Sequence, residues 1–323
     1  MEHWDNGVTG EWEEEYSSRV MNAMREKLVV EPLFSSIPMA RPTLNMPINP
    51  EAGDADWIHP NAYRSSLNPA AETGDGTTVS TGTAVDHQLD ENTLIAYKLA
   101  TREYVGYEEE EDSLVALAPI IRDAVSRRMA KTSDLAILRG AGSLTTASYD
   151  PITGLTNLGG STTDVTIAGG AAWETTAQTG TTLEDALLDM RRNLGIYGLE
   201  PEELRFVVSH DLYYEMLKLD NFKTIDVIGD RATLIRGQLG SIWGVPVVVS
   251  QQFNNAAITA GTVGTQLGLL CRPSNFVIGT HRGLTSEADR DVINQKRVLV
   301  SSRRFAFRDI IVGQATVNLE IAS

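Results

Sequence analysis

The stretch "DLAILRGAG", residues 134–142, holds the glycines of this sequence that most resemble a ligand site. Phosphate-binding glycine loops follow a strand, precede a helix and carry a lysine beside a serine or threonine. Here Gly140 and Gly142 follow a helical pattern, and no Gly-Lys-Ser/Thr sequence occurs in the chain. We therefore interpret these glycines as the end of a helix, where a left-handed residue is common.

No other group of residues has the spacing of a catalytic or metal site. Ser209, His210 and Asp211 have the residue types of a catalytic triad, but consecutive side chains point in different directions. A serine cap at a helix start is the simpler interpretation. The five histidines, at 3, 59, 87, 210 and 281, are scattered, and there is one cysteine. We predict no enzyme activity, no cofactor and no metal site.

Length and charge limit the classes of protein that fit. A chain of 323 residues exceeds the size of one hydrophobic core, so we expect two lobes or one lobe with long extensions. The formal net charge of −16 argues against a broad nucleic-acid-binding face. No apolar run approaches the roughly 18 residues of a membrane span. The single Cys271 excludes an internal disulfide framework and is expected to be a small core residue.

The charges are unevenly distributed. Residues 1–31 hold eight acids and three bases, whereas residues 290–309 hold six bases and two acids. These regions either pair between copies of the chain or form two separate solvated faces.

The N-terminal third of the chain has little that it can pack against by itself. Trp12, Tyr16, Val20, Met24 and Leu28 recur every four residues, which predicts an amphipathic helix. Six prolines in residues 32–61 then favour extended structure. With a polar tip near 73–83 and a strand at 92–107, they predict a long two-stranded excursion. Such a ribbon is marginal alone in water, so it is disordered or lies on another molecule.

The remaining elements alternate more regularly. An acidic stretch at 108–112 suggests a helix start, and a helix of about 20 residues is expected from Pro119 to Gly140 or Gly142. Residues 143–182 read as a surface loop with a short strand near 165. A compact α/β lobe follows, with a capping box at Thr181 and Glu184. Its expected elements are a helix after 181, strands at 204–209, 245–250, 266–271 and 275–279, and a helix at 210–219. Residues 298–321 predict a pair of long strands.

The order of these parts resembles the major capsid proteins of tailed double-stranded DNA phages. "LIAYKLATREYVGYEEEEDSLVALAPIIRDAVSRRMAKTSDLAILRGAG" (94–142) is similar to the returning loop strand, acidic turn and long spine helix of that family. "DPITGLTNL" (150–158), "LRFVVSHDLYYEMLKL" (204–219), "LGSIWGVPVVVSQQF" (239–253) and "RRFAFRDIIVGQATVNLEI" (303–321) resemble its later segments. The likeness covers most of residues 33–321.

The resemblance implies an α+β fold of the Hong Kong 97 type. Its parts would be an N-terminal arm (1–32), an extended loop (33–95), a peripheral domain with spine helix and surface loop (96–180), an axial domain (181–284) and C-terminal strands returning to the peripheral domain (285–323). The implied function is a structural subunit that assembles as homo-pentamers and homo-hexamers into an icosahedral shell around packaged DNA. The implied location is the virion, after synthesis in the bacterial host cytoplasm.

The resemblance also suggests partners and contact residues. The partners would be other copies of the chain, portal and scaffold proteins, possible decoration proteins, and DNA through weak non-specific contact, with no membrane. The candidate assembly contacts are Trp12, Tyr16, Trp57, Tyr63, Glu108, Glu109, Glu110, Arg303, Arg304 and Arg308. We expect the arginines to meet acids of a neighbour, such as those at 108–112 or in its N-terminal arm.

Two departures from the family bear on the chemistry of assembly. Some members form isopeptide cross-links from a lysine in the extended loop, but no lysine lies between Lys27 and Lys98. Contacts are therefore expected to be non-covalent. No long helical scaffolding segment precedes the arm, so a scaffold would be separate, absent or already removed.

Two alternatives remain at this point. An encapsulin-like nanocompartment shell uses the same fold around enzyme cargo, and the long extended loop and Thr/Gly-rich insertion favour the phage interpretation over it. An α/β hydrolase of unknown type would instead be a monomer with a deep pocket.

Overall fold

The computed structural model describes residues 28–48, 90–107, 117–145, 148–158, 164–167, 183–219, 240–253, 265–310 and 316–321. The predicted N-terminal helix, the tip of the extended loop and the acidic stretch at 108–112 lie outside these ranges, as does the capping residue Thr181. The chain divides into two compact units, of which the smaller is Asn45–Thr93 and the larger is the rest.

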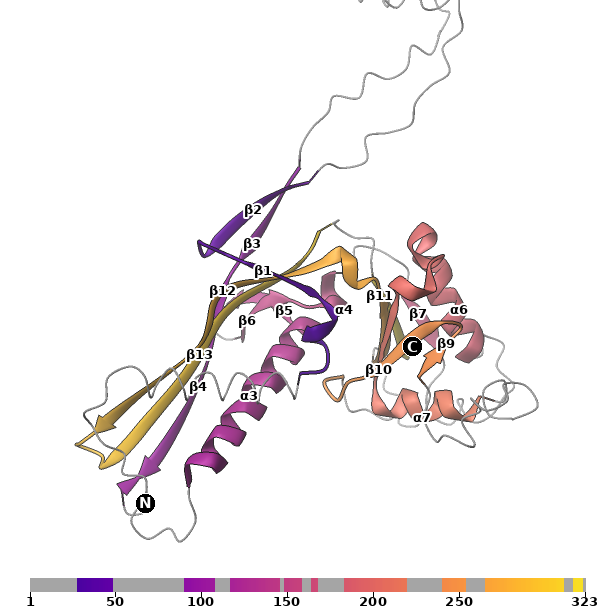
Figure 1. Ribbon diagram of the computed structural model, residues 1–323. Coiled ribbons are helices and arrows are strands. Elements are labelled where there is room, and N and C mark those ends of the chain that lie inside the picture. The colour runs from indigo at the N-terminus through magenta and orange to yellow at the C-terminus, as the bar shows by residue number, and fades with distance from the viewer. Residues whose placement is uncertain are drawn as a thin grey trace, which may run out of the picture. The chain divides into compact units, whose positions relative to one another are not determined.

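A four-stranded sheet forms one part of the larger unit (Figure 1), in the order β1 (Ser35–Pro38), β12 (Phe276–Asp291), β13 (Lys296–Asp309) and β4 (Tyr97–Gly106). β12 and β13 form a long antiparallel hairpin, and β4 pairs antiparallel with β13. β1 lies parallel to β12 at the edge, where the missing N–H of Pro38 is tolerated. This sheet is the surface on which the long helix rests.

The helix α3 (Leu117–Arg139) runs along one face of this sheet (Figure 1). Its sequence is rich in alanine, leucine, arginine and other good helix formers. Val125, Met129, Ser133 and Ile137 recur every four residues and are all buried, so they form the face that packs inward. The predicted helix is confirmed, with a start two residues before Pro119.

A six-stranded sheet forms the second part, in the order β7 (Val165–Ile167), β14 (Thr316–Ile321), β11 (Gln266–Cys271), β8 (Arg205–Val208), β10 (Val245–Val249) and β9 (Ser241–Ile242). The helices α6 (Leu183–Asn193) and α7 (His210–Lys218) pack on it. The predicted stripe of α6 is confirmed, since Leu183, Leu187, Met190 and Leu194 are all buried. This region corresponds to the predicted α/β lobe.

One hydrophobic cluster joins the two sheets. It contains Phe276 and Phe307 of the four-stranded sheet together with Val207 and Leu269 of the six-stranded sheet. The rings of Phe276 and Phe307 are stacked with centroids 5.7 Å apart, and Phe34 packs edge-on to both. Cys271 is fully buried here, as predicted, and burial raises the pKa of its thiol to about 12.

Shorter elements complete the described chain. The smaller unit contains most of the ribbon of β2 (Thr43–Ile48) and β3 (Asp90–Ile95), in which Asn45 contacts the side chains of Glu91 and Thr93. The others are η1 (Glu31–Leu33), β5 (Ala141–Thr145), β6 (Ser148–Thr153), α4 (Leu155–Leu158), η3 (Gly195–Gly198), η4 (Pro201–Glu203) and η7 (Pro273–Asn275). β5 and β6 form a hairpin directly after α3.

Gly140 ends α3 in a crowded crossing rather than in a ligand loop. Its N–H donates to the Ala136 carbonyl, and its own carbonyl accepts from the Gly154 N–H at 2.8 Å. A Cβ at Gly140 would lie 2.1 Å from the Ile152 carbonyl oxygen, so only glycine fits. The left-handed residue is Gly142, with φ of +66°. The helix-end interpretation is therefore confirmed.

The observed strands differ from the predicted ones in three places. The segment predicted as one strand at 92–107 breaks at Ala96 into β3 and β4. The last two strands, β13 and β14, belong to different sheets, since β14 lies between β7 and β11. β12 also starts at Phe276, before the predicted boundary at 284. Sequence alternation gives strands but not their partners, which here are distant in the chain.

Candidate assembly site

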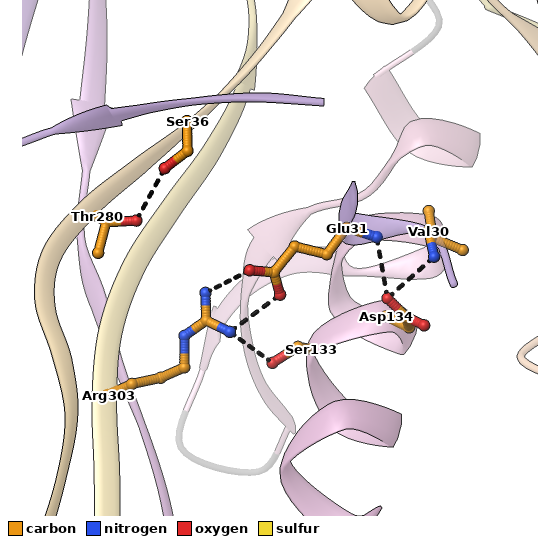
Figure 2. Close-up of polar contacts among 7 residues, drawn as sticks. All are labelled: Val30, Glu31, Ser36, Ser133, Asp134, Thr280 and Arg303. Atoms are coloured by element: carbon orange, nitrogen blue, oxygen red, sulfur yellow. Dashed lines mark hydrogen bonds and ion pairs between the residues drawn. The ribbon is translucent and has the colours of Figure 1, made fainter. Parts of the chain in front are cut away.

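The point where the N-terminal segment joins the body is fixed by one carboxylate of α3. Asp134 accepts hydrogen bonds from the backbone N–H groups of Val29, Val30 and Glu31 at 2.8, 3.2 and 3.1 Å. Figure 2 shows two of these bonds, to Val30 and Glu31. Three donors for one carboxylate hold these residues against the helix, since charge-assisted hydrogen bonds are stronger than neutral ones.

The same segment is held to the sheet by a buried ion pair. The Arg303 guanidinium of β13 donates to both carboxylate oxygens of Glu31, at 2.8 and 2.9 Å (Figure 2). The Arg303 side chain is 4% exposed and that of Glu31 18%. Arg303 also contacts the Ser133 hydroxyl and lies 4.5 Å from the Phe305 ring centroid. We call Glu31, Asp134 and Arg303 the arm-root clasp.

Burial affects the pKa of Asp134, one of the two carboxyl groups in the arm-root clasp. Desolvation raises the pKa of Asp134 above its ordinary value of 3.8, while the three backbone hydrogen bonds lower it and the Glu31 charge raises it further. The net direction is upward. The clasp thus places two acids and one base in a largely dry site, where loss of any one partner is costly.

A second charged feature lies on the other face of the four-stranded sheet. Arg304 of β13 stands directly opposite Lys98 of β4 on one side and Arg282 of β12 on the other. Within the described chain Arg304 has no acidic partner, and its buried Nε lacks a hydrogen bond. Arg282 lies 3.6 Å from Glu287. Like charges directly opposite one another destabilise a sheet. We call Lys98, Arg304 and Arg282 the cationic row.

The structure places the predicted contact residues unequally. Trp12, Tyr16, Trp57, Tyr63, Glu108, Glu109 and Glu110 lie outside the described residues. Arg304 is in the cationic row, and Arg308 is 49% exposed, with Asp309 of the same chain 3.9 Å away. Arg303 requires a correction, because it is buried and paired with Glu31 of its own chain. It faces α3, whereas Arg304 faces away, as adjacent strand residues must.

Sequence reasoning missed Glu31, Asp134, Lys98 and Arg282. Asp134 offered a weak signal, since an acid in the C-terminal half of a helix opposes the helix dipole and needs compensating donors. The other three gain their roles from pairing across strands or between distant segments, which residue types alone do not specify.

The residues that have the types of a catalytic triad lie at the start of α7. Ser209 caps α7 by accepting from the Leu212 N–H at 3.2 Å, which confirms the cap interpretation of the triad-like residues. Among the described residues no three His, Cys, Asp or Glu side chains gather as metal ligands. In the same residues no helix has the length and apolar character to cross a membrane.

The class of this protein follows from its similarity to a known family. The chain belongs to the phage capsid family, because the model of that family matches residues 12–308. This result favours the capsid interpretation over a nanocompartment shell or a hydrolase.

A curated relative is the major capsid protein of Escherichia phage T5. It is 30% identical over 295 residues, which are 90% of this chain and 57% of the T5 protein. The chain therefore spans little more than half the length of that relative.

Solved capsid structures share the fold at low sequence identity. The capsid of a native GTA particle matches with a TM-score of 0.63 and 16% identity, over 92% of this chain and 91% of that chain. A Mycobacterium phage Bobi chain matches with 0.61 and 15%, over 100% and 96%. The capsid of cyanophage P-SCSP1u matches with 0.61 and 17%, over 100% and 93%. The predicted Hong Kong 97-type α+β fold is confirmed.

Proposed function

We propose that this chain is a major capsid protein that assembles with copies of itself into an icosahedral shell around packaged double-stranded DNA. The observation that carries this proposal is the phage capsid family match across residues 12–308, on a chain that adopts the capsid fold. The subunits would form pentamers and hexamers within a virion, after synthesis in the host cytoplasm. The role is structural rather than catalytic.

The cationic row supports contact between subunits. Lys98, Arg304 and Arg282 lie at paired positions on three neighbouring strands. An acidic segment of another copy that covers them would relieve the repulsion between their charges. The acids at 108–112 and in the N-terminal arm remain the proposed partners for Arg304 and Arg308. Portal, scaffold and decoration proteins are further proposed partners, and contact with DNA would be weak and non-specific.

The purified chain is expected to form shells, tubes or rings of five or six subunits. Size-exclusion chromatography followed by electron microscopy measures this directly. Because no lysine lies between Lys27 and Lys98, boiled samples in denaturing gels are expected to show one monomer band. A homogeneous monomer at high concentration contradicts shell formation, and a ladder of covalent oligomers contradicts the non-covalent contacts.

Arg304→Glu is expected to reduce assembly by at least tenfold while leaving the subunit folded. The change reverses the central charge of the row, so an acidic partner is repelled instead of attracted. Yield of assembled particles, measured by sedimentation, is the readout. Arg192→Glu is the matched control, because Arg192 is 82% exposed on α6 and outside the row. Equal losses in both variants, or no loss in Arg304→Glu, would contradict a role for the row.

A further inference from the structure

The four-stranded sheet has two open edges at the end that lies near the turn between β12 and β13. β1 pairs with β12 only from Val277 to Thr280, so no described strand borders β12 on that side from Glu287 onward. At the opposite edge of the sheet, β4 pairs with β13 alone among the described strands. Exposure agrees with this pairing, since residues 287–290 are all exposed and no residue of β4 is buried. Open edges present backbone groups with which another strand can pair.

The two edges carry opposite charges on the same face of the sheet. Glu287 of β12 and Arg102 of β4 both lie opposite Val300 of β13, so the two side chains point to the same side. Asp289 lies two residues beyond Glu287 and therefore points to this side as well. Glu287 is 70% exposed, and Asp289 and Arg102 are exposed too. One edge is thus acidic and the other is basic.

Neighbouring residues of the opposite sign point to the other face. Glu103 of β4 lies on the side of α3, where it pairs with Arg128 of that helix. Arg290 of β12 lies opposite Arg297 of β13, on the same side as Glu103. The contrast between the acidic and the basic edge therefore persists on the face away from α3.

The charges of the two edges are weakly compensated within the subunit. In the described part of the chain, Arg102 forms no ion pair. Glu287 lies 3.6 Å from Arg282, and both side chains of this pair are more than half exposed. Exposed ion pairs of this kind contribute little free energy, so Glu287 remains available to a second cation.

These charges select one way of joining two copies of the chain. Charged side chains on an edge strand ordinarily prevent pairing with other chains. They would repel β12 from β12 and β4 from β4, because like charges would then meet. Opposite charges meet only when β12 of one copy lies beside β4 of the next. Such a contact joins different surfaces of the two copies, and its repetition gives a closed ring or an open chain of subunits.

We propose that the β12 edge of one subunit lies against the β4 edge of a neighbouring subunit, where Arg102 meets Glu287 and Asp289 of that neighbour. A long arginine side chain reaches both a directly opposite and a diagonal residue across paired strands. The contact is limited to the part of β12 beyond Thr285, because the register of β12 is irregular between Thr280 and Thr285. It rests on the proposed assembly into a shell and names the surfaces that two subunits present to each other.

Charge reversal in the full-length chain tests this contact. Arg102→Glu is expected to lower the yield of particles about tenfold, and so is Glu287→Arg combined with Asp289→Arg, because like charges then meet. All three changes together reverse both edges and are expected to restore most of the wild-type yield. Sedimentation measures the yield, and circular dichroism of unassembled subunits shows whether each variant is folded. Arg192→Glu, on the exposed side of α6, is the control and is expected to keep the wild-type yield.

The outcomes separate this contact from the proposed shell function. Normal yield from either reversed edge, or no recovery in the combined variant, overturns the edge contact and leaves the shell function standing. Absence of wild-type particles overturns both proposals.

Cysteine cross-linking shows whether the contact joins two chains, and it does not depend on charge reversal. Within one chain, positions 102 and 287 lie on either side of β13, about 9.5 Å apart at roughly 4.8 Å per strand. A disulfide needs Cα atoms no more than about 6.8 Å apart, so these two positions cannot be bridged within a subunit. Oxidised particles of Arg102→Cys with Glu287→Cys are therefore expected to give covalent oligomers in non-reducing denaturing gels.

Arg192→Cys with Glu287→Cys is the matched control, because both positions are exposed and Arg192 lies on α6. It is expected to run as a monomer. The native Cys271 is fully buried and stays out of the reaction. Monomers alone in the test variant, or equal amounts of oligomer in the control, would contradict the edge contact.

Discussion

Glu31→Ala is expected to destabilise the subunit by about 3 kcal/mol, because it leaves the Arg303 guanidinium charged, buried and unpaired. Arg303 is 4% exposed and makes two hydrogen bonds to Glu31. Its remaining contacts, with the Ser133 hydroxyl and the Phe305 ring, carry no negative charge. Guanidinium-induced unfolding of unassembled subunits measures the loss of unfolding free energy.

Two further variants separate the buried charge from general effects of substitution. Glu31→Leu with Arg303→Met removes both charges and is expected to recover at least half of the loss. Glu287→Ala breaks the exposed pair with Arg282, whose side chains are 70% and 51% exposed, and is expected to cost less than about 1 kcal/mol. A double variant no more stable than Glu31→Ala would refute the account based on an unpaired buried charge.

Gly140→Ala is expected to cost about 3 kcal/mol, at the upper end of the penalty for overpacking. The added Cβ would lie 2.1 Å from the Ile152 carbonyl oxygen and 2.5 Å from that of Ala136. Both obstacles are backbone atoms, so no side-chain rotation relieves the clash. The end of α3 and strand β6 must move apart, which also strains the bond between Gly154 N–H and the Gly140 carbonyl.

Gly240→Ala is the matched control for Gly140→Ala. Nothing lies within 4 Å of a Cβ built at Gly240. Its unfolding free energy is expected to change by less than about 1 kcal/mol in either direction. If Gly140→Ala unfolds at the same denaturant concentration as Gly240→Ala, the crowded crossing is not a constraint on the sequence.

Local patterns predicted the elements whose partners lie nearby. Apolar residues every three or four positions predicted the helices α3 and α6. Ser209 before an amphipathic stretch predicted the start of α7. Long-range pairing was the part that could not be predicted. Alternation at Val317, Leu319 and Ile321 indicates a strand, but the choice between two sheets depends on segments more than 40 residues away in the chain.

The same limit applies to the candidate site. Arg303 and Arg304 were both singled out by charge, and their adjacency in a strand guarantees that they face opposite sides. Which side is buried depends on where α3 packs, and only the fold reveals it. Glu31 was counted among the acids of the arm, yet its partner stands 272 residues later.

The chain passes back and forth between the two sheets, and this order of strands constrains how the chain folds. β8 and β11 enter the six-stranded sheet, β12 and β13 then build the other sheet, and only afterwards does β14 fill the gap between β11 and β7. Contacts this distant in sequence form slowly, because the chain loses the entropy of closing a long loop before the contacts stabilise the fold. Neither sheet has a contiguous sequence of its own. A partly folded chain therefore contains neither sheet in finished form, and both sheets are completed only when segments far apart in the sequence have come together.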